Sequence, residues 1–150
     1  MAEAIGARPA SSCRVVWLCV LAAPPLAWLS ARLGFGLSLA DPWRDGAVLA
    51  LASVAEEIVF RGGVQTLLLR WPALRTRTFI VSGANVVTSI FFAAFHLWRH
   101  PLLVALGVFA VSLVLGHVRE ASGRTWPTAL LHVWFNALLC AATLLVSATR

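Results

Sequence analysis

The chain has 150 residues, of which 60% are hydrophobic and 12% are charged, and its mean hydropathy is +0.85. This small number of polar side chains cannot cover the surface of a soluble globule of this size. The composition therefore excludes a soluble enzyme and predicts a membrane protein. The net charge of +6 does not indicate nucleic-acid binding. The arginines lie mostly at the ends of apolar runs, where membrane topology and anionic lipid account for them.

Five apolar stretches approach the roughly 20 residues that a helix needs to span a bilayer. They cover residues 15–30, 47–69, 79–98, 102–118 and 126–146. Pro24 and Pro25 predict a bend in the first stretch, which we interpret as a retained helix rather than a cleaved signal peptide. Short loops join the last four stretches, and no polar tract or fixed repeat divides the chain. We therefore predict an all-α, polytopic transmembrane bundle of about five spans, forming one domain over residues 1–150.

The arginines also predict an orientation, because cytoplasmic loops are enriched in positive charge. A cytoplasmic N-terminus places seven arginines inside (Arg8, Arg14, Arg70, Arg75, Arg77, Arg119, Arg124) and four outside (Arg32, Arg44, Arg99, Arg150). Arginine without any lysine is typical of a GC-rich genome and favours the cytoplasmic membrane of a bacterium. The three cysteines show no ligand or redox spacing, so we predict neither a disulfide nor a redox role for them: Cys13, Cys19, Cys140.

Three ionisable residues interrupt the second apolar stretch. Glu57 and Arg61 are four residues apart, so their side chains share one helix face and can neutralise each other. That pair alone is equally well explained as a salt bridge that fixes helix packing. Glu56 points about 100° away from Glu57. A second desolvated carboxylate beside the first suits a general base or acid near neutral pH, so we predict that role for Glu56.

The third and fifth stretches each carry a pair at four-residue spacing. Phe92 and His96 share one helix face, as do His132 and Asn136. A single His or Asn in an apolar helix is more often an interhelical hydrogen-bonding residue than a catalytic one. A carboxylate, two imidazoles and an amide on three helices, however, supply a base for water, a proton carrier and donors for an oxyanion. The combination predicts a hydrolytic site.

The other polar residues of these stretches are interpreted as structural. Asn85, Thr88 and Ser89 could line a hydrated cavity or bond neighbouring backbone, and a packing role is the favoured interpretation. His100 and His117 lie at predicted span ends, and we interpret both as interfacial.

The candidate residues form three motifs in chain order. Glu56 to Arg61 fits EExxxR, Phe92 to His96 fits FxxxH, and His132 to Asn136 fits HxxxN. With these motifs the chain resembles the CPBP (Abi) family of intramembrane proteases. That family includes the CAAX prenyl endopeptidases of the Rce1 kind and bacterial relatives linked to bacteriocin immunity or to sorting tags. The resemblance covers about residues 53–139. A chain of this length would be either a pared-down core of the family or a small bacterial, sorting-tag-associated member.

The resemblance implies an endopeptidase that cleaves a membrane-anchored protein or peptide in the lipid bilayer. Glu56 and His96 would activate the attacking water, and His132 and Asn136 would bind the oxyanion of the tetrahedral intermediate. The supporting residues would be Glu57, Arg61 and Phe92. Two His and a Glu could bind zinc, but the chain has no HExxH motif. We therefore prefer a mechanism without metal or cofactor.

Two questions stay open at this stage. A non-enzymatic membrane protein, either a proton-relay carrier or a bacteriocin-immunity factor, could use the same buried residues. Straight spans would also separate His96 and His132 by about 15 Å or more along the membrane normal, given the helical rise of 1.5 Å per residue. If both residues serve one site, the third helix must begin later than residue 79 or be strongly tilted.

Overall fold

The computed structural model describes residues 9–78 and 80–149, without the side chains of residues 9–13 and 15. Arg8 and Arg150 from the orientation count, and the side chain of Cys13, therefore lie outside the described part. The helices are α1 (Pro9–Arg32), α2 (Pro42–Glu57), η1 (Ile58–Gln65), α3 (Thr66–Leu68), α4 (Pro72–Arg75), α5 (Gly83–His96), α6 (Leu102–Ser122) and α7 (Trp126–Ala148). The prediction of an all-α architecture is confirmed.

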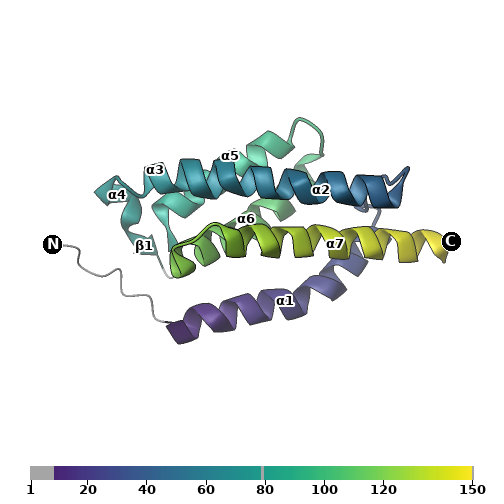
Figure 1. The fold of residues 1–150 in the computed structure, drawn as a ribbon, viewed down its shortest axis with the longest axis horizontal. Helices are drawn as coiled ribbons and strands as arrows, with labels where there is room; N and C mark the ends of the chain where they lie inside the picture. Colours follow the sequence, from purple (N-terminus) through teal and green to yellow (C-terminus); the bar gives the residue numbers. More distant parts are fainter. Residues whose placement is uncertain (1–8, 79, 150) are drawn as a thin grey trace.

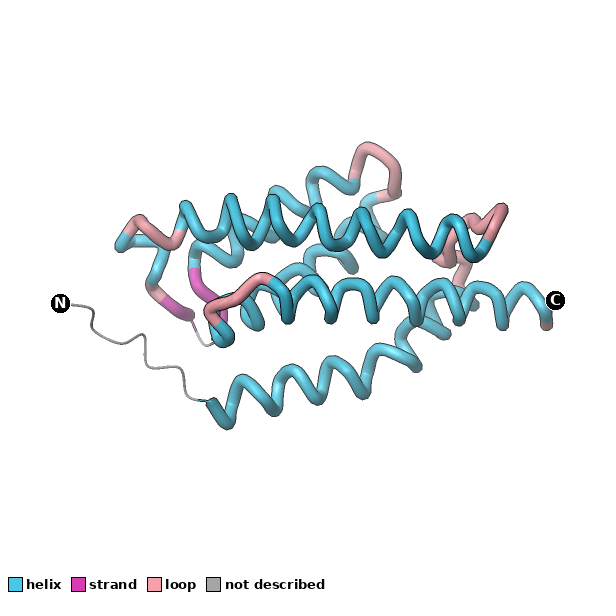
Figure 2. The backbone as a smooth tube through the Cα atoms, in the orientation of Figure 1, coloured by secondary structure: helices cyan, strands magenta, loops and turns pink. Residues whose placement is uncertain are grey.

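The helices form a bundle in which α2, η1 and α3 join into one continuous rod (Figure 1). α7 runs antiparallel beside α2, α1 packs against α7 and α6, and α5 packs against α6. Loops and turns lie mainly at the ends of the helices (Figure 2). This arrangement brings the second, third and fifth predicted spans, which carry the three motifs, into one bundle.

The start of α5 differs from the predicted third span, which began at residue 79. Arg77–Thr78 (β1) and Val81–Ser82 (β2) instead pair as a short antiparallel hairpin. The helix then begins at Gly83, because the Ser82 hydroxyl accepts a hydrogen bond from the Asn85 amide at 3.0 Å, as an N-cap does. The helix is therefore shorter than the predicted span.

α6 runs past the predicted span end at residue 118 and stops at Ser122, where Gly123 adopts a left-handed conformation with φ 68°. This extension overturns one interpretation. His117 was expected at the membrane interface, but it is buried inside α6, and its Nδ1 donates to the Ile80 carbonyl at 3.0 Å. His100 is exposed in the turn after α5.

The described interior is unusually polar for a protein core. Twelve buried residues are polar or charged and ten are hydrophobic. Large apolar side chains such as Leu21, Phe95 and Leu130 lie exposed on the outside. An apolar exterior around a polar interior fits lipid as the solvent, because hydrocarbon surrounds the bundle and polar groups must find partners within it.

Two described helices, α6 and α7, are long and apolar enough to cross a membrane, with hydropathies of 2.1 and 2.0. Shorter apolar helical segments cover Val16–Arg32 and Gly83–His96. The rod of α2, η1 and α3 carries the charged motif, as the second span was predicted to do. These helices fit a membrane protein, and the total of about five spans stays a prediction.

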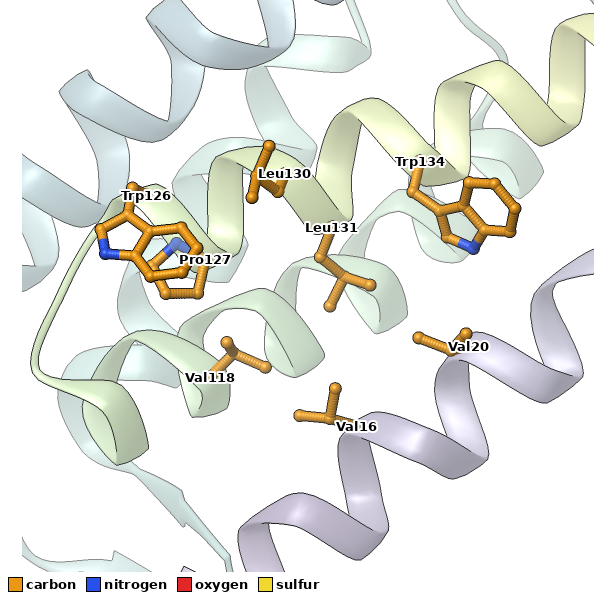
Figure 3. A pocket seen from close by; sticks show the side chains of 8 residues that line it. All are labelled: Val16, Val20, Val118, Trp126, Pro127, Leu130, Leu131 and Trp134. Carbon is orange, nitrogen blue, oxygen red and sulfur yellow. The ribbon is translucent and has the colours of Figure 1, made fainter.

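α1 packs on α6 and α7 around an apolar cavity of about 440 Å³. Figure 3 shows valines of α1 facing leucine and valine side chains of the other two helices, with Trp126 and Trp134 at the sides. None of the predicted site residues lines this cavity.

Gly116 of α6 lies where the Asn85 side chain of α5 packs against α6. A Cβ atom at this position would overlap the amide group of Asn85, which donates to the Leu113 carbonyl at 2.9 Å. We expect Gly116→Ala to lower the free energy of unfolding by about 1–3 kcal/mol through overpacking. Gly107→Ala is the matched control, because no atom lies within 4 Å of its added Cβ. Thermal unfolding in detergent measures both, and equal melting temperatures would contradict the packing argument.

Candidate active site

Glu57 and Arg61 form a buried ion pair at the junction of α2 and η1. Their Oε2 and Nε atoms are 3.4 Å apart, and both side chains are fully buried. Arg61 also donates to the Ser112 hydroxyl at 2.9 Å and to the Ser112 carbonyl at 3.1 Å, and its guanidinium lies 4.8 Å from the centre of the Phe92 ring. The predicted pairing of Glu57 with Arg61 is present, and α6 supplies further partners for the arginine.

The helix that follows Glu57 is a π-helix from Ile58 to Gln65. Such wide turns are rare and occur often at functional sites. Glu57, Arg61 and Gln65 follow one another at four-residue spacing and are all fully buried. The wide turn therefore turns three polar side chains toward the interior of the bundle.

His132 of α7 lies between the two glutamates. Its Nδ1 is 3.1 Å from Glu57 Oε1, and its Nε2 is 3.9 Å from Glu56 Oε2. Because a carboxylate only accepts hydrogen bonds, Nδ1–H is the donor to Glu57. Nε2 then faces Glu56, whose side chain is 25% exposed while that of Glu57 is fully buried. The two adjacent acids thus occupy different environments, and Glu56 is the more accessible.

Asn136 lies one turn after His132 on α7. Its Nδ2 donates to the Ser53 hydroxyl at 2.8 Å, and that hydroxyl donates in turn to the Leu49 carbonyl at 2.7 Å. The amide nitrogen has a second N–H, so one donor is left for another acceptor. Ser53 was not recognised from the sequence, although it stands four residues before Glu57 and therefore on the same helix face.

Phe92 of α5 joins the two histidines. Its ring centre is 4.7 Å from that of His96 and 5.9 Å from that of His132. His96 Nδ1 is 2.8 Å from the Phe92 carbonyl. A carbonyl only accepts, so Nδ1–H donates and the Nε2 atom of a neutral His96 is an acceptor.

The separation of His96 and His132 predicted from straight spans is wrong. Both rings contact one phenylalanine. α5 begins at Gly83 and not at residue 79, which agrees with one of the two alternatives that a shared site required. Glu56 and His132 lie together, and Asn136 is one turn from His132. A contact between Glu56 and His96, which the water-activating pair would need, is not among the interactions found in the described residues.

A chain of hydrogen bonds continues from Arg61 into α5. Ser112 donates to Ser89 at 2.9 Å, and Ser89 donates to the Asn85 amide oxygen at 3.2 Å. All three residues for which the sequence favoured packing are buried: Asn85 and Ser89 make these hydrogen bonds, whereas the Thr88 hydroxyl has no hydrogen-bond partner among the described residues. Ser112 was missed, because an isolated serine in an apolar helix can equally bond its own backbone.

A second polar cluster lies around Glu120 near the end of α6. Its carboxylate accepts hydrogen bonds from Gln65 at 2.9 Å, from Ser82 at 2.5 Å and from Arg77 at 3.1 Å. These contacts tie the β-hairpin and the end of η1 to α6. We interpret the cluster as structural support for the rod that carries the site.

Within the described residues, no group of three His, Cys, Asp or Glu side chains is arranged to hold a metal ion.

A second cavity, of about 410 Å³, lies between α2 and α7, and Asn136 is one of its lining residues. The other three predicted catalytic residues, Glu56, His96 and His132, do not line this cavity or the apolar cavity beside α1.

No curated protein and no solved structure matches the chain. A family model described as type II CAAX prenyl endopeptidase Rce1-like matches residues 38–138, which include the three motifs. Because this match covers more than half of the chain, the protein belongs to the Rce1-like family of CAAX-type intramembrane proteases, which act on membrane-associated proteins.

Proposed function

We propose that this protein is an intramembrane endopeptidase in which Glu56 activates water to hydrolyse a peptide bond of a membrane-anchored substrate. The observation that carries the proposal is the arrangement of His132 between a buried, arginine-paired Glu57 and a more accessible Glu56. Family membership supports the class of reaction, and this arrangement supports a separate chemical role for each of the three residues.

Glu56 is the proposed general base. It has no ion pair with an arginine among the described contacts, and its side chain is partly exposed, so a water molecule can reach it. The carboxylate takes a proton from water while the oxygen of that water attacks the substrate carbonyl carbon. The protonated Glu56 then gives the proton to the leaving amine as the C–N bond breaks, which completes the hydrolysis.

His132 and Asn136 are the proposed donors to the oxyanion. Because Nδ1 of His132 is held by the Glu57 carboxylate, Nε2 is the ring atom left to face the oxyanion. Asn136 contributes the N–H that does not bind Ser53. Donors fixed in this way stabilise charge that develops in the transition state.

His96 is the proposed second contact for the attacking water. Its Nδ1–H is held by the Phe92 carbonyl, so Nε2 of the neutral ring can accept a hydrogen bond from water. Phe92 packs between this ring, His132 and Arg61, and so positions all three. In this arrangement Phe92, Glu57 and Arg61 are positioning residues.

We further propose that hydrolysis needs no metal, since Glu56 can act as both base and acid while His132 and Asn136 bind the oxyanion. The test uses purified protein in liposomes with a farnesylated peptide that ends in Cys-Leu-Leu-Ser, a CAAX-type sequence. We expect cleavage at equal rates with and without a strong zinc chelator. Activity that is lost with the chelator and restored by zinc would refute the metal-free mechanism. Failure to cleave, combined with Glu56-dependent proton uptake, would favour the proton-relay alternative.

A further inference from the structure

Ser112 lies in the middle of α6, 51 residues along the chain from Arg61, and its side chain is fully buried. Its hydroxyl and its carbonyl both accept hydrogen bonds from Nη2 of Arg61, at 2.9 Å and 3.1 Å. These are the hydrogen bonds that the described structure gives the Arg61 side chain, because its 3.4 Å contact with Glu57 is an ion pair without hydrogen-bond geometry. The direction of the guanidinium therefore depends on α6 as well as on the charge of Glu57.

The hydroxyl of Ser112 is itself oriented by a chain of donors and acceptors. The Asn85 side chain donates from Nδ2 to the Leu113 carbonyl at 2.9 Å, and its amide oxygen faces Ser89. That oxygen can only accept, so the Ser89 hydroxyl donates to it at 3.2 Å and accepts from Ser112 at 2.9 Å. The Ser112 proton is then used. A lone pair of its oxygen is left for Arg61, whose side chain can only donate.

The same chain continues from Arg61 to the proposed site. Arg61 pairs with Glu57 Oε2, and the other oxygen of that carboxylate accepts the Nδ1–H of His132 at 3.1 Å. Glu57, Arg61 and Ser112 are fully buried, so bulk water does not weaken these contacts. A change in the direction of the guanidinium therefore moves the carboxylate, and with it the imidazole that faces Glu56.

We propose that Ser112 is a positioning residue for hydrolysis: its hydroxyl holds the Arg61–Glu57 pair in the direction that sets the His132 ring against the reacting carbonyl. This inference rests on the proposed function, because it takes His132 as a contact of the oxyanion. A misplacement of about 1 Å can cost about 10²-fold in rate. The loss falls on kcat rather than on KM, because the oxyanion forms only in the transition state. Ser89 acts one step further back, by fixing the Ser112 hydroxyl.

Removing the hydroxyl tests the proposal. Ser112→Ala keeps the carbonyl contact with Arg61, and we expect kcat for the farnesylated Cys-Leu-Leu-Ser peptide to fall about tenfold or more, with KM changed less than about twofold. Ser112→Cys should behave in the same way, because a thiol is only a weak acceptor. Ser112→Thr keeps the hydroxyl and should recover most of the rate. A normal kcat without the hydroxyl would overturn the proposal, as would an equally low kcat in Ser112→Thr that melts as the wild type does.

Two control variants separate positioning from stability. Thr88→Val removes a hydroxyl that is as deeply buried but has no hydrogen-bond partner among the described residues. Val146→Ala removes apolar volume from a buried cluster near the C-terminal end of α7 and should lower the melting temperature. Both controls should keep the wild-type kcat. An equal fall in kcat in Val146→Ala and Ser112→Ala would mean that reduced stability alone explains the loss, and would overturn the proposal.

The hydrogen bond between His132 and Glu57 provides a readout that does not depend on cleavage. In protein with ¹⁵N-labelled histidine in detergent micelles, NMR follows the Nδ1 proton of His132, which is assigned by its loss in His132→Gln. We expect this proton to exchange with water about tenfold faster or more in Ser112→Ala, because the carboxylate that accepts it is less firmly held. Thr88→Val should exchange at the wild-type rate. Unchanged exchange in Ser112→Ala would overturn the proposal.

The two experiments separate failure of this inference from failure of the proposed function. Faster exchange in Ser112→Ala, in a protein whose wild type cleaves no peptide, would keep Ser112 as the residue that fixes the His132 ring and refute the peptidase. Cleavage by the wild type, with normal kcat and normal exchange in Ser112→Ala, would keep the peptidase and refute the positioning role. Neither cleavage nor a change in exchange would refute both.

Discussion

Glu56→Gln is expected to reduce kcat by about 10²–10⁴-fold or more, because the water loses its base and a ligand that positions it at the same time. The substitution keeps the size of the side chain and removes only the charge and the basicity. Because Glu56 makes no ion pair with Arg61 among the described contacts, the variant should insert into the membrane and melt as the wild type does. Initial rates with the farnesylated peptide, together with a melting curve in detergent, measure both effects.

Asp45→Asn is the control for loss of a carboxylate on the same helix. Asp45 lies near the start of α2, where it accepts hydrogen bonds from the Ala40 and Asp41 amides, and it has no part in the proposed site. We expect this variant to retain its rate. Near-normal activity in Glu56→Gln would refute the assignment of the base, since no other carboxylate faces Nε2 of His132 in the described structure.

Arg61→Ala is expected to destabilise the protein by about 3–5 kcal/mol, because it leaves the fully buried Glu57 carboxylate without its cation. The change also removes the hydrogen bonds to Ser112 and the contact with the Phe92 ring. Chemical or thermal unfolding in detergent, and the yield of protein in the membrane, report the loss. Normal yield with an unchanged melting temperature would show that the pair does not hold the bundle together.

The double variant Glu57→Gln with Arg61→Gln should be more stable than Arg61→Ala, because no unpaired charge stays buried. It should still lose activity, since His132 loses the carboxylate that holds its ring in place through Nδ1. Arg77→Ala is a suitable control, because Arg77 is 39% exposed in its ion pair with Glu120. Such partly exposed pairs contribute about 0–1 kcal/mol.

The sequence predicted those parts of the fold that depend on local pattern. The last predicted span, residues 126–146, agrees closely with α7, because Pro127 favours a helix start and the apolar run continues to its end. The positions of Glu57 and Arg61 on one face followed from their spacing alone. The different surroundings of Glu56 and Glu57 followed from the angle between adjacent residues.

Other features depend on contacts between distant segments and could not be predicted. The π-helix at Ile58–Gln65 has no distinct hydrophobic period, and the hairpin before Gly83 interrupts an apolar run that reads as helix. The partner of Arg61 lies 51 residues away on α6. The register between α2 and α7, which pairs Ser53 with Asn136, appears only once the helices are packed. These features set the depth of His96 and His132, which is why straight spans separated them.

The most direct test of the central claim is a single turnover of wild-type protein with the farnesylated Cys-Leu-Leu-Ser peptide in H₂¹⁸O, followed by mass spectrometry of the products. Attack by water that Glu56 activates predicts one heavy oxygen in the new carboxylate of the first product formed. Product with only ordinary oxygen would mean that a carboxylate of the protein attacked instead. An intact peptide, under conditions where the protein is folded in the membrane, would contradict the peptidase itself.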